Sequence, residues 1–157
     1  MVNNPTFYKF KAVGISANQL GHKHRYLIIL NSLEKCLQNG YKEMDGGVTY
    51  CLNPKFISCP SDASFEEDEE GCLSILSKKA RVSRPSSILA SYFTLEGQAV
   101  TRKFEGDHAR IFLHELDHLD GILMTDSSRG SEVYENTEFK DWQDRQRVRQ
   151  KYNFLKD

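Results

Sequence analysis

The alternation of apolar and polar positions predicts strands early in the chain. Residues 25–30 and 48–52 are short and rich in Tyr, Ile, Leu and Val, a composition that favours strands. The second segment runs into Asn53 and Pro54, and we expect the proline to end its regular pairing. Residues 32–47 combine helix-like apolar spacing with a closing Asp-Gly-Gly, so a helical turn and a hairpin both remain open there.

The middle of the chain predicts a charged loop and a hairpin. Residues 61–70 form a polar, acidic stretch that leads into the segment 71–74, and a charge run of this kind is usually a solvated loop. Residues 87–93 and 99–104 flank the short segment 95–98. That spacing is typical of two antiparallel strands joined by a tight turn.

The last third of the chain predicts two helices. Asp107 can accept the free N–H groups of a first helical turn, and Gly121 stands where a left-handed C-cap falls, which brackets a helix at 108–119. A loop at 127–131 follows. Apolar residues then recur among charged ones and predict an amphipathic C-terminal helix within 130–157, namely Phe139, Trp142, Val148, Tyr152 and Leu155.

Composition indicates one folded domain over residues 1–157. The 39% hydrophobic content supports a buried core, and a net charge of −1 offers no positive field for nucleic acid. The longest apolar run, residues 26–30, is far too short for a bilayer, and the first residues lack a signal-peptide layout. We therefore expect a soluble cytoplasmic protein with reduced thiols, no DNA partner and no membrane partner.

Residues 114–118 read H-E-L-D-H, which is the pattern H-E-x-x-H. On a helix, the spacing of four places His114 and His118 on one face about one turn apart, within reach of one metal ion. Glu115 lies beside them. The motif alone is suggestive, because two ordinary helix histidines produce the same letters.

A catalytic site of this kind needs a third protein ligand and one position open for water. Cys72 is the best candidate, because Gly71 permits close backbone approach and the turn ends an acidic segment. Cys51 sits in an expected strand and is interpreted as a small core residue. Cys36 and Cys59 remain open.

This ligand set predicts amide hydrolysis. A divalent ion lowers the pKa of a bound water towards about 7 and polarises a carbonyl. Glu115 would take the proton of that water and deliver it to the leaving amine, a transfer usually worth about 10²–10⁴ in rate. A backbone N–H next to Cys72 and a nearby side-chain amide would stabilise the oxyanion.

Three segments together resemble the motifs of the peptide deformylases, in the order of that family. They are residues 14–19 (G-I-S-A-N-Q), 70–74 (E-G-C-L-S) and 114–119 (H-E-L-D-H-L). Short strands first and helices late predict an α+β fold, with antiparallel or mixed sheets packed around a central metal-binding helix and a helix at the C-terminus. The resemblance implies removal of the formyl group from formylmethionine at the start of newly made polypeptides, with release of formate.

The roles of the family carry over to matching positions. Gly14 and Glu70 would border the peptide cleft, and the pocket for the methionine side chain would lie near Val13, Arg110 and Ile111. The remaining roles implied are metal binding by Cys72, His114 and His118, acid–base catalysis by Glu115, and oxyanion stabilisation by Gln19 and the backbone N–H of Leu73.

The resemblance also implies a cofactor and partners. One divalent ion is expected, ferrous iron in the cell and zinc, nickel or cobalt in purified protein, although the general affinity order favours zinc. The partner would be the formyl-Met end of a nascent polypeptide, with a transient ribosome contact by a monomer. An ion pair of Asp117 with Arg84 is expected to support the metal-binding helix.

The chain departs from the family pattern in several places. Ala12 replaces a glycine, Ser16 replaces an alanine, Leu113 replaces a glutamine, and Leu76 stands where proline is frequent. Fewer residues than usual precede Gly14, so we expect either a minimal variant or support for the N-terminal side from elsewhere.

Two rival functions remain open. An endopeptidase with a carboxylate or histidine as third ligand would tolerate Cys72→Ser. A non-enzymatic module that binds peptide termini or the ribosome, with a closed structural metal, would tolerate Glu115→Gln.

Overall fold

The computed structural model describes residues 13–31 and 47–153. The segment 32–47, for which a helical turn and a hairpin were both open, therefore lies outside the described residues except for Gly47. In chain order the elements are β1 (Gly14–Ser16), the 3-10 helix η1 (Ala17–Leu20), β2 (Tyr26–Leu30), β3 (Val48–Ser58), β4 (Phe65–Gly71), β5 (Lys78–Pro85), β6 (Ser87–Phe93), β7 (Ala99–Glu105), α3 (Asp107–Leu119), β8 (Gly130–Glu135) and α4 (Thr137–Asn153).

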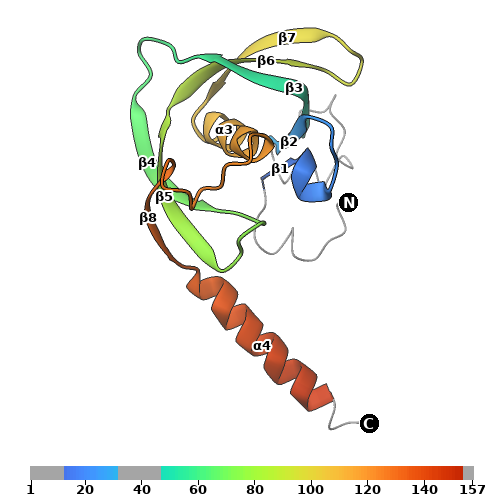
Figure 1. The fold of residues 1–157 in the computed structure, drawn as a ribbon, viewed down its shortest axis with the longest axis vertical. Helices are drawn as coiled ribbons and strands as arrows, with labels where there is room; N and C mark the ends of the chain where they lie inside the picture. Colours follow the sequence, from blue (N-terminus) through green and yellow to red (C-terminus); the bar gives the residue numbers. More distant parts are fainter. Residues whose placement is uncertain (1–12, 32–46, 154–157) are drawn as a thin grey trace.

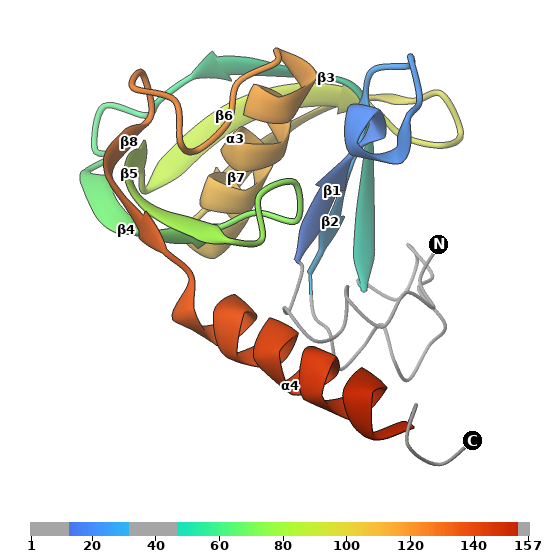
Figure 2. The same cartoon turned by 60° about the horizontal axis from the view of Figure 1, so that its bottom comes forward.

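The described strands form two antiparallel sheets around one helix. The larger sheet has the order β1-β2-β3-β6-β7 and the smaller one β4-β5-β8. Figure 1 shows α3 enclosed between these sheets, while α4 projects away from the body, as the turned view in Figure 2 also shows. The expected α+β architecture with a central helix and a C-terminal helix is thus confirmed.

The main core lies between α3 and the large sheet. Leu27, Ile29 and Ile88 on the strands are fully buried and pack with Phe112 of α3. The rings of Phe104 and Phe112 lie 4.9 Å apart, and losing a buried phenylalanine of this kind typically costs about 3–5 kcal/mol. This packing holds α3 in place, with one of its faces against the large sheet.

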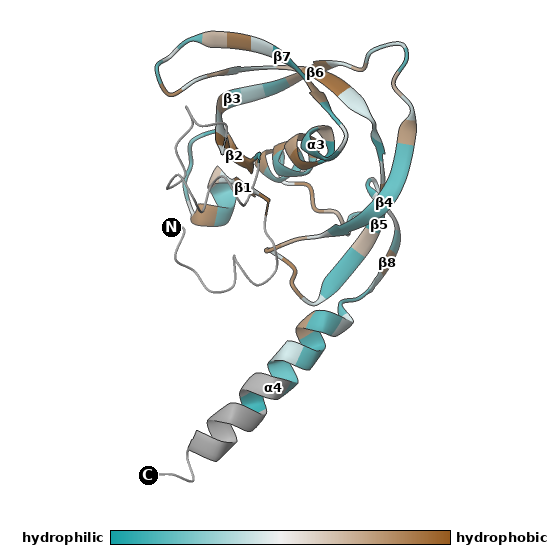
Figure 3. Ribbon diagram, turned by 180° about the vertical axis from the view of Figure 1, so that it is seen from behind, coloured by the Kyte–Doolittle hydropathy of each residue, from teal (hydrophilic) through white to brown (hydrophobic). Residues whose placement is uncertain are grey.

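A smaller core lies between the small sheet and the segment that follows α3. Ala80 and Val82 of β5 pack with Met124 and Cys72, and all four are buried. Cys72 therefore sits against an apolar cluster directly after β4. Figure 3 shows hydrophobic residues on α3 and on the strands that face it, whereas β4 and α4 are mainly hydrophilic.

Strand β3 is longer than predicted, because Pro54 does not end it. The strand continues to Ser58, with a register shift between Leu52 and Lys55 in its pairing with β6. Asn53 adopts φ 49° at this point. Such an irregularity lets a strand pass a residue that has no N–H to donate. Regular pairing is thus interrupted at Pro54 as predicted, but the predicted end of the strand at this point was wrong.

The acidic stretch is a strand and not the predicted loop over most of its length. Residues 65–71 pair with β5 without interruption. Because β4 is an edge strand of the small sheet, its charged side chains stay in water while its backbone is paired, and charges on an edge also oppose pairing with other molecules. Only Glu70 of this strand is buried.

The predicted hairpin is confirmed, since β6 and β7 pair from Ser87↔Glu105 to Phe93↔Ala99. Helix α3 begins one residue earlier than predicted. Gly106 is the N-cap residue and Asp107 is the first helical residue, so the predicted Asp107 cap was wrong. At the other end Gly121 has φ 76°, as the predicted left-handed cap requires.

The segment after 130 is not helical throughout. Residues 130–135 form β8, which pairs with β5, and the helix begins at Thr137. Phe139 is buried and its ring stacks on Trp142 at 5.7 Å. The side chains of Val148, Tyr152 and Leu155 lie outside the described part. Within the part of the chain that is described, no helix has the length and apolar character needed to cross a membrane.

Candidate metal centre

A thiol and two imidazoles meet where β4 ends beside α3. The Sγ of Cys72 lies 3.1 Å from the Nε2 of His118, which lies 3.1 Å from the Nε2 of His114. The ligand atoms of all three residues fall within 4.8 Å of one another. One thiolate and two imidazoles are donors that zinc and other first-row ions accept, so the residues present fit a divalent metal.

The electrostatics of the cluster favour a thiolate at Cys72. Burial raises the pKa of the thiol, but hydrogen bonds with His114 and His118 outweigh it and bring the pKa to about 5. The backbone N–H of Ser74 also points at Sγ, at 3.3 Å. The sulfur is therefore in the form that binds metals.

Glu70 orients the first histidine. Its Oε2 lies 2.8 Å from Nδ1 of His114, which leaves Nε2 of that ring directed at the cluster. Burial raises the pKa of Glu70, but His114 and Arg84 lower it to about 2. Burial lowers the pKa of His114, but Cys72 and Glu70 raise it to about 10. A metal ion must therefore displace a proton from His114 when it binds.

A buried arginine connects this carboxylate to the metal-binding helix. Arg84 donates to both oxygens of Glu70, at 2.6 and 2.9 Å, and its third nitrogen reaches Oδ2 of Asp117 at 2.9 Å. The predicted pair of Asp117 with Arg84 is confirmed. Arg129 binds the other oxygen of Asp117 at 2.8 Å, a contact that no sequence pattern indicated.

Glu115 is the unusual carboxylate of the site. It is 4% exposed, and its Oε2 has no hydrogen-bond partner among the described residues. Burial raises its pKa to about 7. A carboxylate with a free oxygen and a pKa near neutrality can both accept and return a proton.

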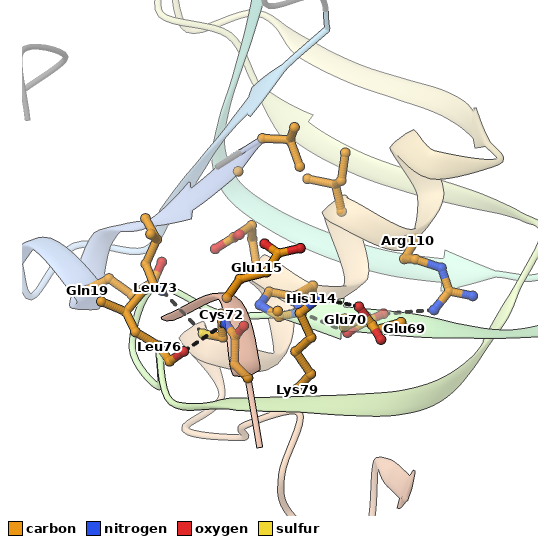
Figure 4. A pocket seen from close by; sticks show the side chains of 16 residues that line it. Gln19, Glu69, Glu70, Cys72, Leu73, Leu76, Lys79, Arg110, His114 and Glu115 are labelled. Atoms are coloured by element: carbon orange, nitrogen blue, oxygen red, sulfur yellow. Dashed lines mark hydrogen bonds and ion pairs between the residues drawn. The ribbon is translucent and has the colours of Figure 1, made fainter. Parts of the chain in front are cut away.

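Gln19 and Leu73 approach the cluster from two different segments. The Nε2 of Gln19 donates to Oγ of Ser74 at 3.0 Å and lies 3.9 Å from Sγ of Cys72. Figure 4 shows Gln19 and Leu73 on one side of Cys72 and Arg110 at the opposite end, beyond His114. Both Gln19 and Leu73 line the same cavity.

That cavity has a volume of about 530 Å³. Cys72, His114 and Glu115 line it, whereas His118 is buried and does not. Every residue expected in the peptide cleft is on its wall, namely Val13, Gly14, Glu70, Arg110 and Ile111.

The side chain of Arg110 is held in place by hydrogen bonds although it lines the cavity. Its guanidinium donates to Glu70, to the carbonyl of Val82 at 2.9 Å and to the carbonyl of Glu66 at 2.7 Å. The side chain therefore ties α3 to β4 and β5 as well as lining the cavity.

Several wall residues were missed by sequence reasoning. Lys79 of β5, together with Asn136 and Glu138 near the start of α4, also borders the cavity. No motif includes them. Lys79 reaches the site because it pairs opposite Gly71 in the small sheet, and Asn136 and Glu138 reach it because β8 pairs with β5 and carries the chain back. Ser74, which stands inside the second motif, is a partner of Gln19 that the motif could have indicated.

Comparison with known proteins places these features in a family. The sequence profile of the family described as polypeptide deformylase matches residues 2–133. The chain is 34% identical over 121 residues to peptide deformylase 2 of Gloeobacter violaceus, covering 77% of this chain and 59% of that protein. The chain spans between 55% and 65% of the length of this and other curated relatives from Prochlorococcus marinus and Thermotoga maritima.

Solved structures show the same similarity. A peptide deformylase from Synechococcus elongatus in complex with actinonin superposes with a TM-score of 0.62 at 30% identity, covering 75% of this chain and 59% of that one. A peptide deformylase from Plasmodium falciparum superposes with a TM-score of 0.66 at 29% identity, covering 96% and 75%.

Proposed function

Because this chain belongs to the polypeptide deformylase family, we propose that it removes the formyl group from formylmethionine at the N-terminus of newly made polypeptides and releases formate. The observation that carries the proposal is that Cys72 and His114, two of the three candidate metal ligands, line the same cavity as Glu115. The carboxylate of Glu115 is buried, and one of its oxygens has no hydrogen-bond partner among the described residues. A structural metal site is closed by protein ligands and does not require a carboxylate base beside it.

Cys72, His114 and His118 would hold one divalent ion. When bound, the ion supplies Lewis-acid chemistry, since it polarises a carbonyl oxygen and makes a coordinated water more acidic. From the family resemblance we infer ferrous iron in the cell and zinc, nickel or cobalt in purified protein. A thiolate with two imidazoles accepts each of these ions.

Glu115 would move the proton. Its carboxylate takes a proton from the attacking water and returns it to the amine that leaves as the new N-terminus, which balances the hydrolysis of one amide to formate and a free amine. The raised pKa of about 7 supports this role, because a group serves best in both directions when its pKa is near the working pH. Gly14 lies directly against this side chain, so close that a Cβ would meet its Oε1 at 2.7 Å.

Gln19 and the backbone N–H of Leu73 would stabilise the negative charge on the carbonyl oxygen. Donors placed in advance where charge develops are usually worth about 10²–10³ in rate each. Support comes from the position of the Gln19 amide, which lies 3.9 Å from Sγ of Cys72 and is held by Ser74.

The cavity wall supports a peptide substrate. It combines apolar side chains of Val13 and Ile111 with residues of β1 and β4, which are edge strands of the two sheets formed by the described residues. A short extended peptide could pair with such an edge, with the methionine side chain near Val13, Arg110 and Ile111. Action as a monomer in the cytoplasm, with a transient ribosome contact, stays a prediction.

The test is formate release from a formyl-Met tripeptide by protein prepared without air, with its metal counted. Glu115→Gln is expected to keep about one metal per chain and lose at least about 100-fold in kcat, because the proton transfer is lost, while Cys72→Ser should lose the metal. Glu96→Gln, a matched change on the exposed β6–β7 turn, should leave both unchanged.

Each rival function has its own result in this experiment. Cleavage of internal peptide bonds with no formate release would favour an endopeptidase. An intact, metal-loaded chain that hydrolyses neither substrate would leave only the binding module, and the deformylase proposal would be abandoned.

A further inference from the structure

Ser16 is a buried polar residue at the junction of β1 and η1. It ends β1, caps η1 and has no exposed surface. Its backbone N–H donates to Oε1 of Gln19 at 2.9 Å, and its hydroxyl donates to the same oxygen at 3.0 Å. Two donors on one acceptor are directed at a single atom of the Gln19 amide.

These two donors determine which end of the amide faces the cavity. A backbone N–H can only donate, so the atom of Gln19 that faces Ser16 must be the oxygen. The nitrogen is therefore at the opposite end, where one of its hydrogens is used by Ser74 at 3.0 Å. The same nitrogen also lies 3.9 Å from Sγ of Cys72, so the N–H end of the amide is on the side of the metal-type cluster and the cavity.

We propose that the hydroxyl of Ser16 is a positioning group, which holds the Gln19 amide so that its nitrogen faces the carbonyl that reacts. The inference rests on the proposed function for the role of Gln19, although the orientation itself does not. The last torsion of a glutamine side chain is broad, so the backbone N–H alone permits more rotation than the two donors together. A donor held before the reaction needs no reorganisation during it.

Two alternative roles of the Ser16 hydroxyl lead to different experimental results. The contact of Gln19 with the Ser16 N–H resembles a helix cap, and in a pure cap the hydroxyl contributes only to stability. Ser16 also hydrogen-bonds the carboxylate of Glu115. Because a hydroxyl has one proton, it can serve Gln19 or Glu115 at any moment but not both, and the effect through Glu115 would not depend on Gln19.

The first measurement is a double-mutant cycle on formate release. Ser16→Ala is expected to lower kcat about three- to tenfold with KM within about twofold, as for one lost neutral hydrogen bond. Gln19→Ala should cost about 100-fold. In the Gln19→Ala background, Ser16→Ala should then change kcat by less than about twofold, because a group that acts through Gln19 has nothing left to position.

The second measurement does not need activity. The side-chain amide of Gln19 is observed by ¹⁵N–¹H NMR in the metal-loaded chain and assigned by its loss in Gln19→Ala. Ser16→Ala should move the two hydrogen signals towards those of exposed glutamines. The matched control is Thr49→Val, which removes another buried hydroxyl that donates to an amide oxygen at 3.0 Å, in β3 and outside the cavity wall. It should leave the Gln19 signals and kcat unchanged.

Either of two results would overturn the inference. One is an equal loss of kcat from Ser16→Ala with and without Gln19, and the other is an unmoved Gln19 amide. If the unaltered chain released no formate, the proposed function would fail, and the NMR result would still decide whether Ser16 orients the amide.

Discussion

At Gly14, strand β1 passes so close to α3 that no side chain fits between them. A Cβ at this position would lie 2.7 Å from Oε1 of Glu115 and 2.7 Å from Cγ2 of Ile111. Neither neighbour can easily move aside, because Glu115 is buried and Ile111 packs on the main core. The absence of a side chain at residue 14 therefore permits the buried position of Glu115.

We expect Gly14→Ala to lower the free energy of unfolding by about 1–3 kcal/mol, the usual cost of forcing extra atoms into a packed site. Denaturant unfolding measures this directly. Gly71→Ala is the matched control for stability, because a Cβ there meets nothing within 4 Å. Equal effects of the two substitutions would contradict the close approach.

Glu115 also makes stability depend on pH when no metal is bound. Its pKa in the folded chain, about 7, is above the ordinary 4.5, because burial penalises the charged form. A raised pKa of this kind contributes stability that is fully present below pH 4.5 and is lost as the pH rises through 7. The buried charge therefore destabilises the metal-free chain at alkaline pH.

Glu115→Gln, which is neutral at every pH, is expected to stabilise the metal-free chain at about pH 8 by up to about 3 kcal/mol relative to its effect at about pH 5. Unfolding in urea with a chelator present, at both pH values, measures the difference. A difference that does not change with pH would show that Glu115 is not held with a raised pKa.

Among the elements, α3 carries most of the site, and the small sheet holds it through charges. Arg84 of β5 is 4% exposed and connects Glu70 of β4 with Asp117 of α3. Breaking a buried ion pair by removing one partner typically costs about 3–5 kcal/mol, because the other charge stays buried. The orientation of His114 depends on this connection through Glu70.

Asp117→Asn is therefore expected to weaken metal retention. The rate of metal transfer to a coloured chelator should rise about tenfold, within the range for lost partners behind a metal ligand. Arg129→Gln removes a partner of the same carboxylate that is 42% exposed, so it should have a smaller effect. Unchanged transfer in Asp117→Asn would remove the proposed support.

In the molecule as a whole, the two sheets form a body from which α4 extends (Figures 1 and 2). The contact with the body is made near the start of the helix, where Phe139 is buried and Asn136 donates to the carbonyl of Leu76 at 2.9 Å. Asn136 and Glu138 border the cavity. The beginning of α4 thus belongs to the site.

A chain that ends after Asp144 should keep the stability of the body within about 0.5 kcal/mol, because α4 projects away from both sheets in Figure 1. Phe139→Ala should cost about 2–4 kcal/mol, because it empties a buried site. Thermal unfolding of both variants separates the two parts of the helix. A larger loss from the truncation would show that the distal part packs on the body.

Features that depend on local geometry follow from the order of residues along the chain. The spacing of His114 and His118 places both rings on one face of any helix, and the Gly121 cap and the β6–β7 turn depend on neighbouring residues. Cys72 was selected by a glycine before it and an acidic segment, and its place beside the imidazoles agrees with that choice. The three family motifs contain half of the residues of the cavity wall.

Features that need a distant partner arise only when the chain folds. The acidic stretch is a strand because β5 pairs with it, and Pro54 is tolerated because β3 shifts its register against β6. The proposed role of Ser16 depends on the orientation of the Gln19 side-chain amide, and no spacing of residues along the chain reveals that orientation. Pairing, burial and hydrogen-bond direction arise between segments that are far apart in sequence, so they are properties of the folded chain alone.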